Sequence, residues 1–175
     1  MRCSRGGQTG IKCTAMNDRA DTIVVRDVSQ SDWQDVRRLL DKAGLPVSDL
    51  GPDRLEGFLI AERPCAEQSE TLGTIGLQQF DQVGLLRSLV VSDSGRKSGL
   101  GKRLVAALEA NACCAGVTDL WLLTIDAERY FENLGYKMMS RDCAPEIIRE
   151  TEEFSGLCPD GAYLMHKALN NDTRK

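Results

Sequence analysis

The chain has 175 residues, of which 42% are hydrophobic and 27% are charged, and its formal net charge is -4 at pH 7. This composition is typical of one globular domain with a hydrophobic core. The acidic balance argues against nucleic acid as a partner, because phosphate binding needs a basic surface. No stretch reaches about 18 consecutive apolar residues, and the basic start lacks the apolar run of a secretion signal. We therefore expect a soluble protein that has no membrane partner.

Seven cysteines are scattered along the chain. Their odd number and the lack of a secretion signal predict reduced thiols and a cytoplasmic location. Cys113 and Cys114 are adjacent, so on a helix their side chains would point about 100° apart. His166 is the single histidine that could complete a metal site with them. We therefore expect no metal, and we interpret the cysteines as small buried residues or surface positions.

The chain predicts one continuous domain with a loose front end. Residues 1–19 contain Gly, Arg and Ser without periodicity and are expected to be disordered. A single domain then covers residues 20–170, and residues 171–175 form a tail.

The first part of this domain combines one helix with several strands. Residues 22–28 are rich in β-branched side chains and predict a strand. Residues 31–43 predict a helix, in which Ser31 and Gln34 form a capping box and Gly44 ends the helix. A turn or short helix at 50–54 and three strands follow, at 57–62, 72–80 and 83–91.

After residue 91 the pattern alternates between helix and strand. The segments expected, in order, are a helix at 99–115, a strand at 120–124, a helix at 126–134, a strand at 136–140, a helix at 145–154 and a strand at 162–167. This order of elements predicts an α+β fold with a mixed sheet.

A glycine-containing loop follows the strand that ends at Val91. Residues 92–101 read SDSGRKSGLG and lead into the expected helix. The backbone N–H groups at a helix start have no partner within the helix, so they can bind a diphosphate together with the positive helix end. Gly99 and Gly101 would let the backbone approach the anion closely. Three basic side chains could neutralise it: Arg96, Lys97 and Lys102. The alternative is a surface turn with incidental basic residues.

Two other phosphate-binding motifs do not fit this loop. A Walker A loop has glycine five residues before its Gly-Lys pair, where this chain has Arg96, and Arg103 follows the lysine instead of Ser or Thr. A dinucleotide-binding motif that starts at Gly99 would need glycine where the chain has Leu104.

What remains resembles the GNAT superfamily of N-acetyltransferases. Arg96, Gly99 and Gly101 match its acetyl-CoA signature, Arg/Gln-x-x-Gly-x-Gly/Ala, and residues 127–136 (AERYFENLGY) resemble its second motif, A-x-x-F-Y-x-x-x-G-F. The likeness in layout covers about residues 21–169. It implies the GNAT fold, in which helices flank a mixed, mostly antiparallel sheet and splayed central strands hold acetyl-CoA.

The resemblance also implies a reaction and a set of site residues. An amine would attack the thioester directly in a ternary complex, and the main-chain N–H of Val91 would stabilise the oxyanion. The acceptor would be a small-molecule amine. Both a monomer and a homodimer are compatible with the resemblance. The implied cofactor-binding residues are Leu89, Val91, Arg96, Lys97, Ser98, Gly99, Leu100, Gly101, Lys102 and Asn133.

The acid and the base of the reaction are not evident from the residues. Family members often have a proton-donating tyrosine four residues before the glycine of the second motif, where this chain has Phe131. Tyr130 precedes it, points about 100° away on a helix, and is expected to be a core aromatic. Candidates for a general base rest on residue type alone: Glu56, Glu62, Asp81 and Asp126.

Arg87 is the one charged residue in an otherwise apolar strand. An unpaired buried guanidinium is costly, so Arg87 either holds an oxyanion of the substrate or forms a salt bridge within the sheet. A finer resemblance, to an arsenic-resistance-associated GNAT subgroup in which phenylalanine at 131 is normal, implies a small amine as the acceptor, with organoarsenical amino acids among the candidates. It rests on segments 85–89, 130–136, 144–149 and 157–159. A non-catalytic acetyl-CoA-binding module and an enzyme that acetylates protein N-termini or lysines are the alternatives.

Overall fold

A computed structural model describes residues 22–65, 69–159 and 161–169 of the chain. The disordered segment expected at 1–19 and the tail expected at 171–175 therefore lie outside the described residues. Within the described ranges, seven strands form one sheet in the order β1-β2-β3-β4-β5-β7-β6. The strands are β1 Val24–Asp27, β2 Phe58–Arg63, β3 Glu70–Phe80, β4 Val83–Val91, β5 Asp119–Thr124, β6 Lys137–Met139 and β7 Tyr163–Ala168.

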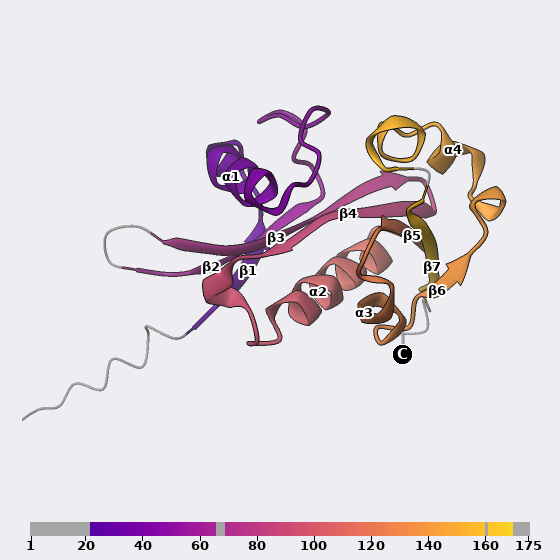
Figure 1. Cartoon of the computed structure of the whole chain (residues 1–175). Helices are drawn as coiled ribbons and strands as arrows, with labels where there is room; N and C mark the ends of the chain where they lie inside the picture. Colours follow the sequence, from indigo (N-terminus) through magenta and orange to yellow (C-terminus); the bar gives the residue numbers. More distant parts are fainter. Residues whose placement is uncertain (1–21, 66–68, 160, 170–175) are drawn as a thin grey trace, which may run out of the picture.

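Helices cover both faces of this sheet (Figure 1). The helices are α1 Trp33–Ala43, α2 Leu100–Cys114, α3 Glu128–Glu132 and α4 Glu146–Arg149. Figure 1 shows α1 and α4 on one face and α2 and α3 on the other. The predicted α+β fold with a mixed sheet is thereby confirmed. No helix in the described part of the chain is long and apolar enough to cross a membrane.

The two halves of the sheet join where β4 meets β5. This is a parallel pair, and every other neighbouring pair of strands is antiparallel. The pairing runs from Val83 opposite Asp119 to Leu86 opposite Leu122 and then stops. On its other side β4 stays paired with β3 as far as Val91. The second half of β4 therefore has an open edge on the β5 side, which is the splay that the family resemblance implied.

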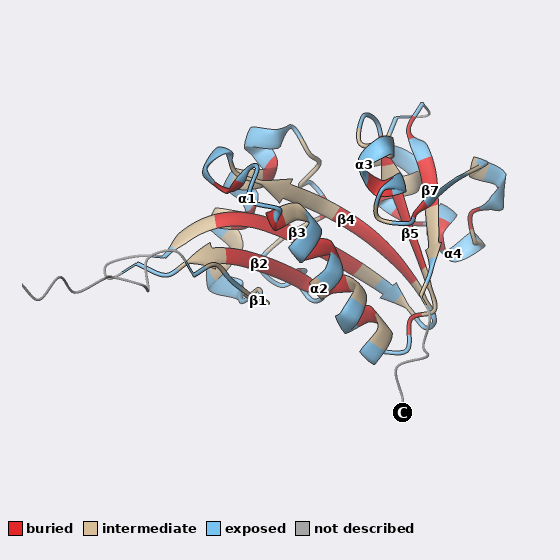
Figure 2. Ribbon diagram, turned by 90° about the horizontal axis from the view of Figure 1, so that it is seen from below, coloured by how far each residue is buried: buried red, intermediate tan, exposed pale blue. Residues whose placement is uncertain are grey.

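Apolar residues on the helices account for how α1 and α2 pack. Leu100, Leu104, Leu108 and Ala112 recur every fourth residue of α2 and are buried against the sheet. Val36 and Leu40 of α1 are buried against Phe58 and Ile60 on the opposite face. Figure 2 shows the buried segments of β2, β3 and β4 in the middle of these strands, with α2 lying across the sheet.

The start of α1 differs from the prediction. The reciprocal capping pair is Ser29 with Asp32, not Ser31 with Gln34, and a 3-10 turn precedes the helix. The Asp32 carboxylate accepts a hydrogen bond from the Ser29 N–H at 2.8 Å and also pairs with Arg26. A carboxylate that is fixed by Arg26 outcompetes Gln34 as the capping group, and the periodicity of the helix does not reveal this.

The helix predicted at 145–154 is also interrupted. It divides into α4 and a separate π-helical turn, Glu153–Leu157. Between them, the Thr151 hydroxyl donates to the Ile148 carbonyl at 2.7 Å and accepts from the Phe154 N–H at 3.2 Å. These side-chain hydrogen bonds compete with those of a continuous α-helix and end it at this point.

Candidate functional site

The open half of β4 carries an irregular backbone. Gly76 of β3 faces Arg87, but Thr74 faces Val90, so β4 contains one extra residue between these pairs. Ser88 lies in this bulge with a φ of 57°, in the left-handed region that non-glycine residues seldom adopt. The bulge changes the direction of the strand next to its open edge. Bulges of this kind are frequent beside functional sites.

The main-chain N–H of Val91 faces that open edge. Val91 lies opposite Gly73, and the next N–H along, that of Ser92, donates to the Leu72 carbonyl at 2.8 Å. In an antiparallel pair this arrangement marks Val91 and Gly73 as a non-hydrogen-bonded pair. The Val91 N–H therefore points away from β3 and toward the gap between β4 and β5.

The start of α2 supplies further N–H groups. Gly99 has a φ of 74° and precedes the helix, and the first hydrogen bond within the helix runs from the Arg103 N–H to the Gly99 carbonyl at 3.1 Å. The N–H groups of Leu100, Gly101 and Lys102 therefore have no partner in the helix. Together with the positive end of a 15-residue helix, they can bind an anion.

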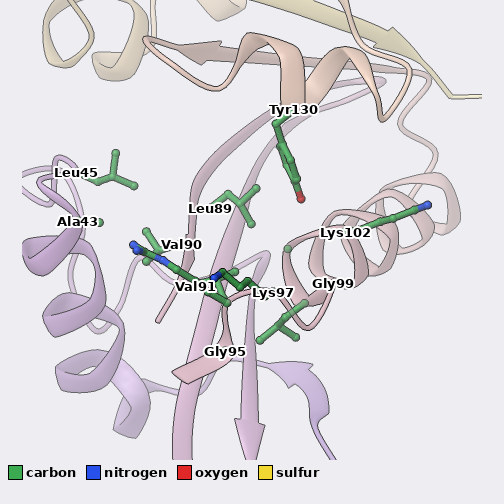
Figure 3. Close-up of a pocket in the computed structure, with 13 residues that line it drawn as sticks. Ala43, Leu45, Leu89, Val90, Val91, Gly95, Lys97, Gly99, Lys102 and Tyr130 are labelled. Atoms are coloured by element: carbon green, nitrogen blue, oxygen red, sulfur yellow. The ribbon is translucent and has the colours of Figure 1, made fainter. Parts of the chain in front are cut away.

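A cavity of about 540 Å³ lies between β4, the start of α2 and the end of α1. In Figure 3, Ala43 and Leu45 stand on one side of it, and Tyr130 and α2 stand on the other. Eight of the cofactor-binding residues expected from the sequence line this cavity: Leu89, Val91, Arg96, Lys97, Gly99, Leu100, Gly101 and Lys102. Ala43, Leu45, Val90, Gly95 and Tyr130 complete the lining.

Two of the expected residues do not line the cavity. The Ser98 hydroxyl donates to the Gly95 carbonyl at 2.6 Å and stabilises the loop instead. Asn133 is exposed at the end of α3. Conversely, Leu45 belongs to the site because Gly44 is left-handed and the Leu45 N–H bonds to the Leu40 carbonyl. An apolar residue directly after a helix-ending glycine is the sequence signal that could have indicated Leu45.

Exposed basic side chains surround the loop end of the cavity. Arg96 lies 3.1 Å from the Asp93 carboxylate, which Lys42 of α1 also contacts at 2.6 Å. The hydrogen bond and charge of Lys42, followed by the charge of Arg96, lower the pKa of Asp93. Lys97 and Lys102 form no ion pair with the described residues, so both are available for phosphate groups.

The prediction that Tyr130 is a core aromatic is wrong. Its side chain lines the cavity and is 37% exposed, whereas Phe131 is buried and packs edge-to-face on Tyr130 and Tyr136. A Cβ placed on Gly101 would lie 2.7 Å from the Tyr130 hydroxyl, so the glycine makes room for the phenol. Because Phe131 turns into the core, its neighbour on this short helix points into the cavity. Partial burial raises the pKa of Tyr130, which keeps the hydroxyl protonated.

None of the four carboxylates suggested as a general base lines this cavity. Glu62 is held by Arg26 at 3.0 Å, and Asp81 lies in the turn between β3 and β4. Asp126 is exposed before α3, and Glu56 lines a different cavity. The described part of the chain contains no group of three or more side chains that could hold a metal ion.

Arg87 does not reach the cavity either. Its side chain is 1% exposed, and its guanidinium is hydrogen-bonded to both carboxylate oxygens of Asp49, with 2.9 Å between Nη2 and Oδ1. Nη2 also lies 2.8 Å from Glu153, in ion-pair contact but not aligned as a hydrogen bond. Of the two roles considered for Arg87, the structure supports the salt-bridged strand residue. The reason is that two carboxylates from distant segments occupy the positions that a substrate anion would need.

A second cavity, of about 440 Å³, lies on the face that carries α1 and α4. Its lining includes the apolar side chains of Leu50, Phe58 and Phe80 and more acidic than basic side chains. The carboxylates are Asp49, Glu56, Glu150 and Glu152, and the basic side chain is Arg54. Asp49 is already neutralised by Arg87. An amine would find a more favourable electrostatic environment here than a carboxylate would.

Comparisons with known proteins identify acetyltransferases as similar to this chain. Residues 54–138 match the sequence profile of the acetyltransferase (GNAT) domain. A relative from Chlorobaculum tepidum, described as an uncharacterized N-acetyltransferase, is 33% identical over 63 residues, which are 36% of this chain and 40% of that protein. The matching region thus spans two fifths of the length of this relative.

Solved structures resemble the chain over most of its length. N-acetylglutamate synthase from Neisseria gonorrhoeae, complexed with coenzyme A and N-acetyl-glutamate, gives a TM-score of 0.70 at 22% identity over 85% of this chain and 35% of that one. A Mycobacterium tuberculosis protein in complex with CoA gives 0.70 at 20% identity, over 84% and 99%. A GNAT-family acetyltransferase from Staphylococcus aureus gives 0.64 at 19% identity, over 85% and 100%.

At these identities the structural likeness establishes the fold. The profile match runs from β2 through β4 and α2 to α3 and includes all the residues that line the cavity except Ala43 and Leu45. Residues 54–138 of the chain therefore match the acetyltransferase (GNAT) domain, and the described fold is that of solved acetyltransferases.

Proposed function

We propose that the chain transfers the acetyl group of acetyl-CoA to a primary amine of a small molecule. The observation that carries this proposal is the cavity in which the open edge of β4 meets the unpaired N–H groups of α2. The diphosphate of the cofactor would bind at Gly99 to Lys102, where N–H groups and basic side chains converge. Its pantetheine arm would extend along β4 toward Leu89. CoA in the solved neighbours supports acetyl-CoA as the co-substrate.

The reaction needs few protein groups. The amine nitrogen attacks the thioester carbon, and the developing oxyanion is stabilised by the Val91 N–H. The carbon–sulfur bond then breaks, the amine loses a proton, and the leaving sulfur takes one from the Tyr130 hydroxyl. Among the described residues no carboxylate lines the cavity, so a water molecule would accept the amine proton. This mechanism forms no covalent intermediate with the enzyme.

The acceptor that we propose is a small molecule with a free amine. A small amine or an amino-acid-like molecule is our first choice, and the resemblance of segments 85–89 and 144–149 to an arsenic-resistance-associated subgroup adds arsenical amino acids as candidates. Since Arg87 is paired within the protein, recognition of an acceptor anion by Arg87 is not part of the proposal.

A thiol-release assay tests this proposal. The chain is mixed with acetyl-CoA and a panel of alkylamines, amino acids, arsenical amino acids and peptides with a free N-terminus. Acetyl-dependent release of CoA thiol that saturates with one small amine is the expected result. Release with peptides alone would identify a protein acetyltransferase instead. Binding of acetyl-CoA without release from any amine would identify a non-catalytic binding module.

A further inference from the structure

The buried ion cluster on β4 joins three segments that are far apart in the sequence. We define the Arg87 cluster as Arg87, Asp49 and Glu153, whose side chains are 1%, 5% and 11% exposed. Asp49 belongs to the connection between α1 and β2, and Glu153 begins the π-helical turn after α4. Arg87 therefore holds two segments on this face of the sheet against β4.

Arg87 stands where β4 becomes irregular on both sides. Leu86 is the last residue of β4 that pairs with β5, so the open edge begins at Arg87. Arg87 is also the last residue before the bulge against β3, and Ser88 follows it with its left-handed backbone. Contacts that hold the Arg87 side chain in place therefore also hold the backbone at the residue where the open half of β4 begins.

Charge keeps this cluster intact. Burial opposes ionisation of Arg87, but hydrogen bonds with Asp49 and the charges of Glu153 and Asp49 outweigh it and raise the pKa of the guanidinium. The bidentate contact with Asp49 also restricts the guanidinium to one orientation. A flexible apolar side chain at this position would not define the same orientation.

Stability does not by itself account for such a cluster. Apolar residues of similar volume often replace a buried ion cluster without loss of stability, because burial of charges is costly. What an ionic cluster adds is a defined geometry. In this chain that geometry lies next to the strand edge at which the thioester would bind.

We propose that Arg87 is a positioning residue, which through Asp49 and Glu153 holds the backbone of residues 88–91 in the geometry that acetyl transfer requires. This inference rests on the proposed function, because it assigns the cluster to that same site. Arg87 touches neither cofactor nor acceptor in this role. It acts on the reaction through the position of the Leu89 and Val91 main chain.

The test replaces the whole cluster by apolar residues, as Arg87→Met with Asp49→Leu and Glu153→Leu. We expect this triple variant to melt near the wild-type temperature and to bind CoA normally, because the loop at residues 95–102 is intact. Its kcat should fall roughly 10- to 100-fold, because a displacement of about 1 Å at a reacting centre is that costly. Amide hydrogen exchange in residues 88–91 should become faster, while exchange in α2 stays unchanged.

The chain offers a matched control and a second route. Arg26 contacts Asp32 and Glu62 at 2.8 and 3.0 Å on β1 and lines neither cavity, so Arg26→Met should leave kcat unchanged while Arg87→Met lowers it. Arg87→Lys, which keeps the charge but loses the fork, should retain more activity than Arg87→Met. If the triple variant does not fold, Glu153→Gln, which keeps the side-chain volume, is measured by the same readouts.

Two outcomes separate this inference from the proposed function. A folded triple variant with wild-type kcat and wild-type exchange at residues 88–91 would overturn the positioning role and leave the acetyltransferase proposal standing. A wild-type chain that releases no thiol with any amine would overturn the proposed function. The comparison of hydrogen exchange at residues 88–91 between the triple variant and the wild type would then still test the positioning role, because this measurement needs no turnover.

Discussion

Tyr130 and Phe131 are adjacent in the sequence and lie in different environments. The family pattern places the proton donor at position 131, but Phe131 is in the core and the Tyr130 hydroxyl reaches the cavity beside Gly101. The residue type at position 131 of the motif therefore does not by itself tell whether a tyrosine hydroxyl reaches the cavity. The deciding factor is which neighbour the packing of α3 turns inward, and this depends on contacts such as that with Tyr136.

Removal of the Tyr130 hydroxyl should slow the reaction. We expect Tyr130→Phe to lower kcat by roughly 10- to 100-fold with little change in the KM for acetyl-CoA, because a general acid acts on the leaving sulfur. Tyr163→Phe, at an exposed tyrosine of β7, is the control and should be silent. Equal rates for Tyr130→Phe and the wild type would show that water protonates the thiolate.

The pH dependence of the same step has a defined sign. Burial raises the pKa of Tyr130, so the phenol stays in its acidic form up to and beyond the ordinary tyrosine range near pH 10. The wild-type rate should therefore not decline between about pH 7 and 9 through loss of this proton. A pH–rate profile in which kcat falls across that interval, and in which Tyr130→Phe removes the fall, would contradict this assignment.

Gly101 lies next to the Tyr130 hydroxyl and at the proposed diphosphate site. A side chain there would meet the Tyr130 hydroxyl and would fill the space at the start of α2. We expect Gly101→Val to weaken CoA binding by at least about tenfold, or about 1.4 kcal/mol, measured by calorimetry. Gly51→Val is the matched control, because nothing lies within 4 Å of a Cβ at that position. Normal CoA affinity in Gly101→Val would contradict the assignment of the diphosphate-binding site to this loop.

At the scale of elements, the break between α4 and the π-helical turn has an identifiable cause. Thr151 is buried, and its hydroxyl makes one hydrogen bond on each side of the break. The break is also what presents Glu153 to Arg87, since a continuous helix would direct that carboxylate differently. A local hydrogen-bonding choice thus determines a contact with a strand far away in the sequence.

Substitution of Thr151 tests this element directly. Thr151→Val keeps the shape of the side chain but leaves the Phe154 N–H without its partner, which should cost about 1–3 kcal/mol. The melting temperature should fall by several degrees, as is usual for a domain of this size. Thr71→Val, whose hydroxyl makes one long 3.5 Å contact, should change it much less. Equal shifts in the two variants would contradict the role of Thr151.

At the scale of the whole molecule, local patterns and long-range contacts differ in how well they can be predicted. The periodicity of α2, the β-branched strands and the glycine loop indicate most of the sheet and most of the cavity lining. The Arg87 cluster could not be derived this way, because Asp49 and Glu153 reach it only through the packed fold. The position of β7 between β5 and β6 is likewise a property of the sheet rather than of any segment.

We propose that acetyl-CoA binds between the open edge of β4 and the start of α2. Amide hydrogen exchange with and without acetyl-CoA measures this directly. We expect slower exchange in residues 89–91 and 99–102 when acetyl-CoA is bound, and unchanged exchange in α4 and the π-helical turn. Protection that is absent from both cavity segments, or that appears only around the second cavity, would contradict it.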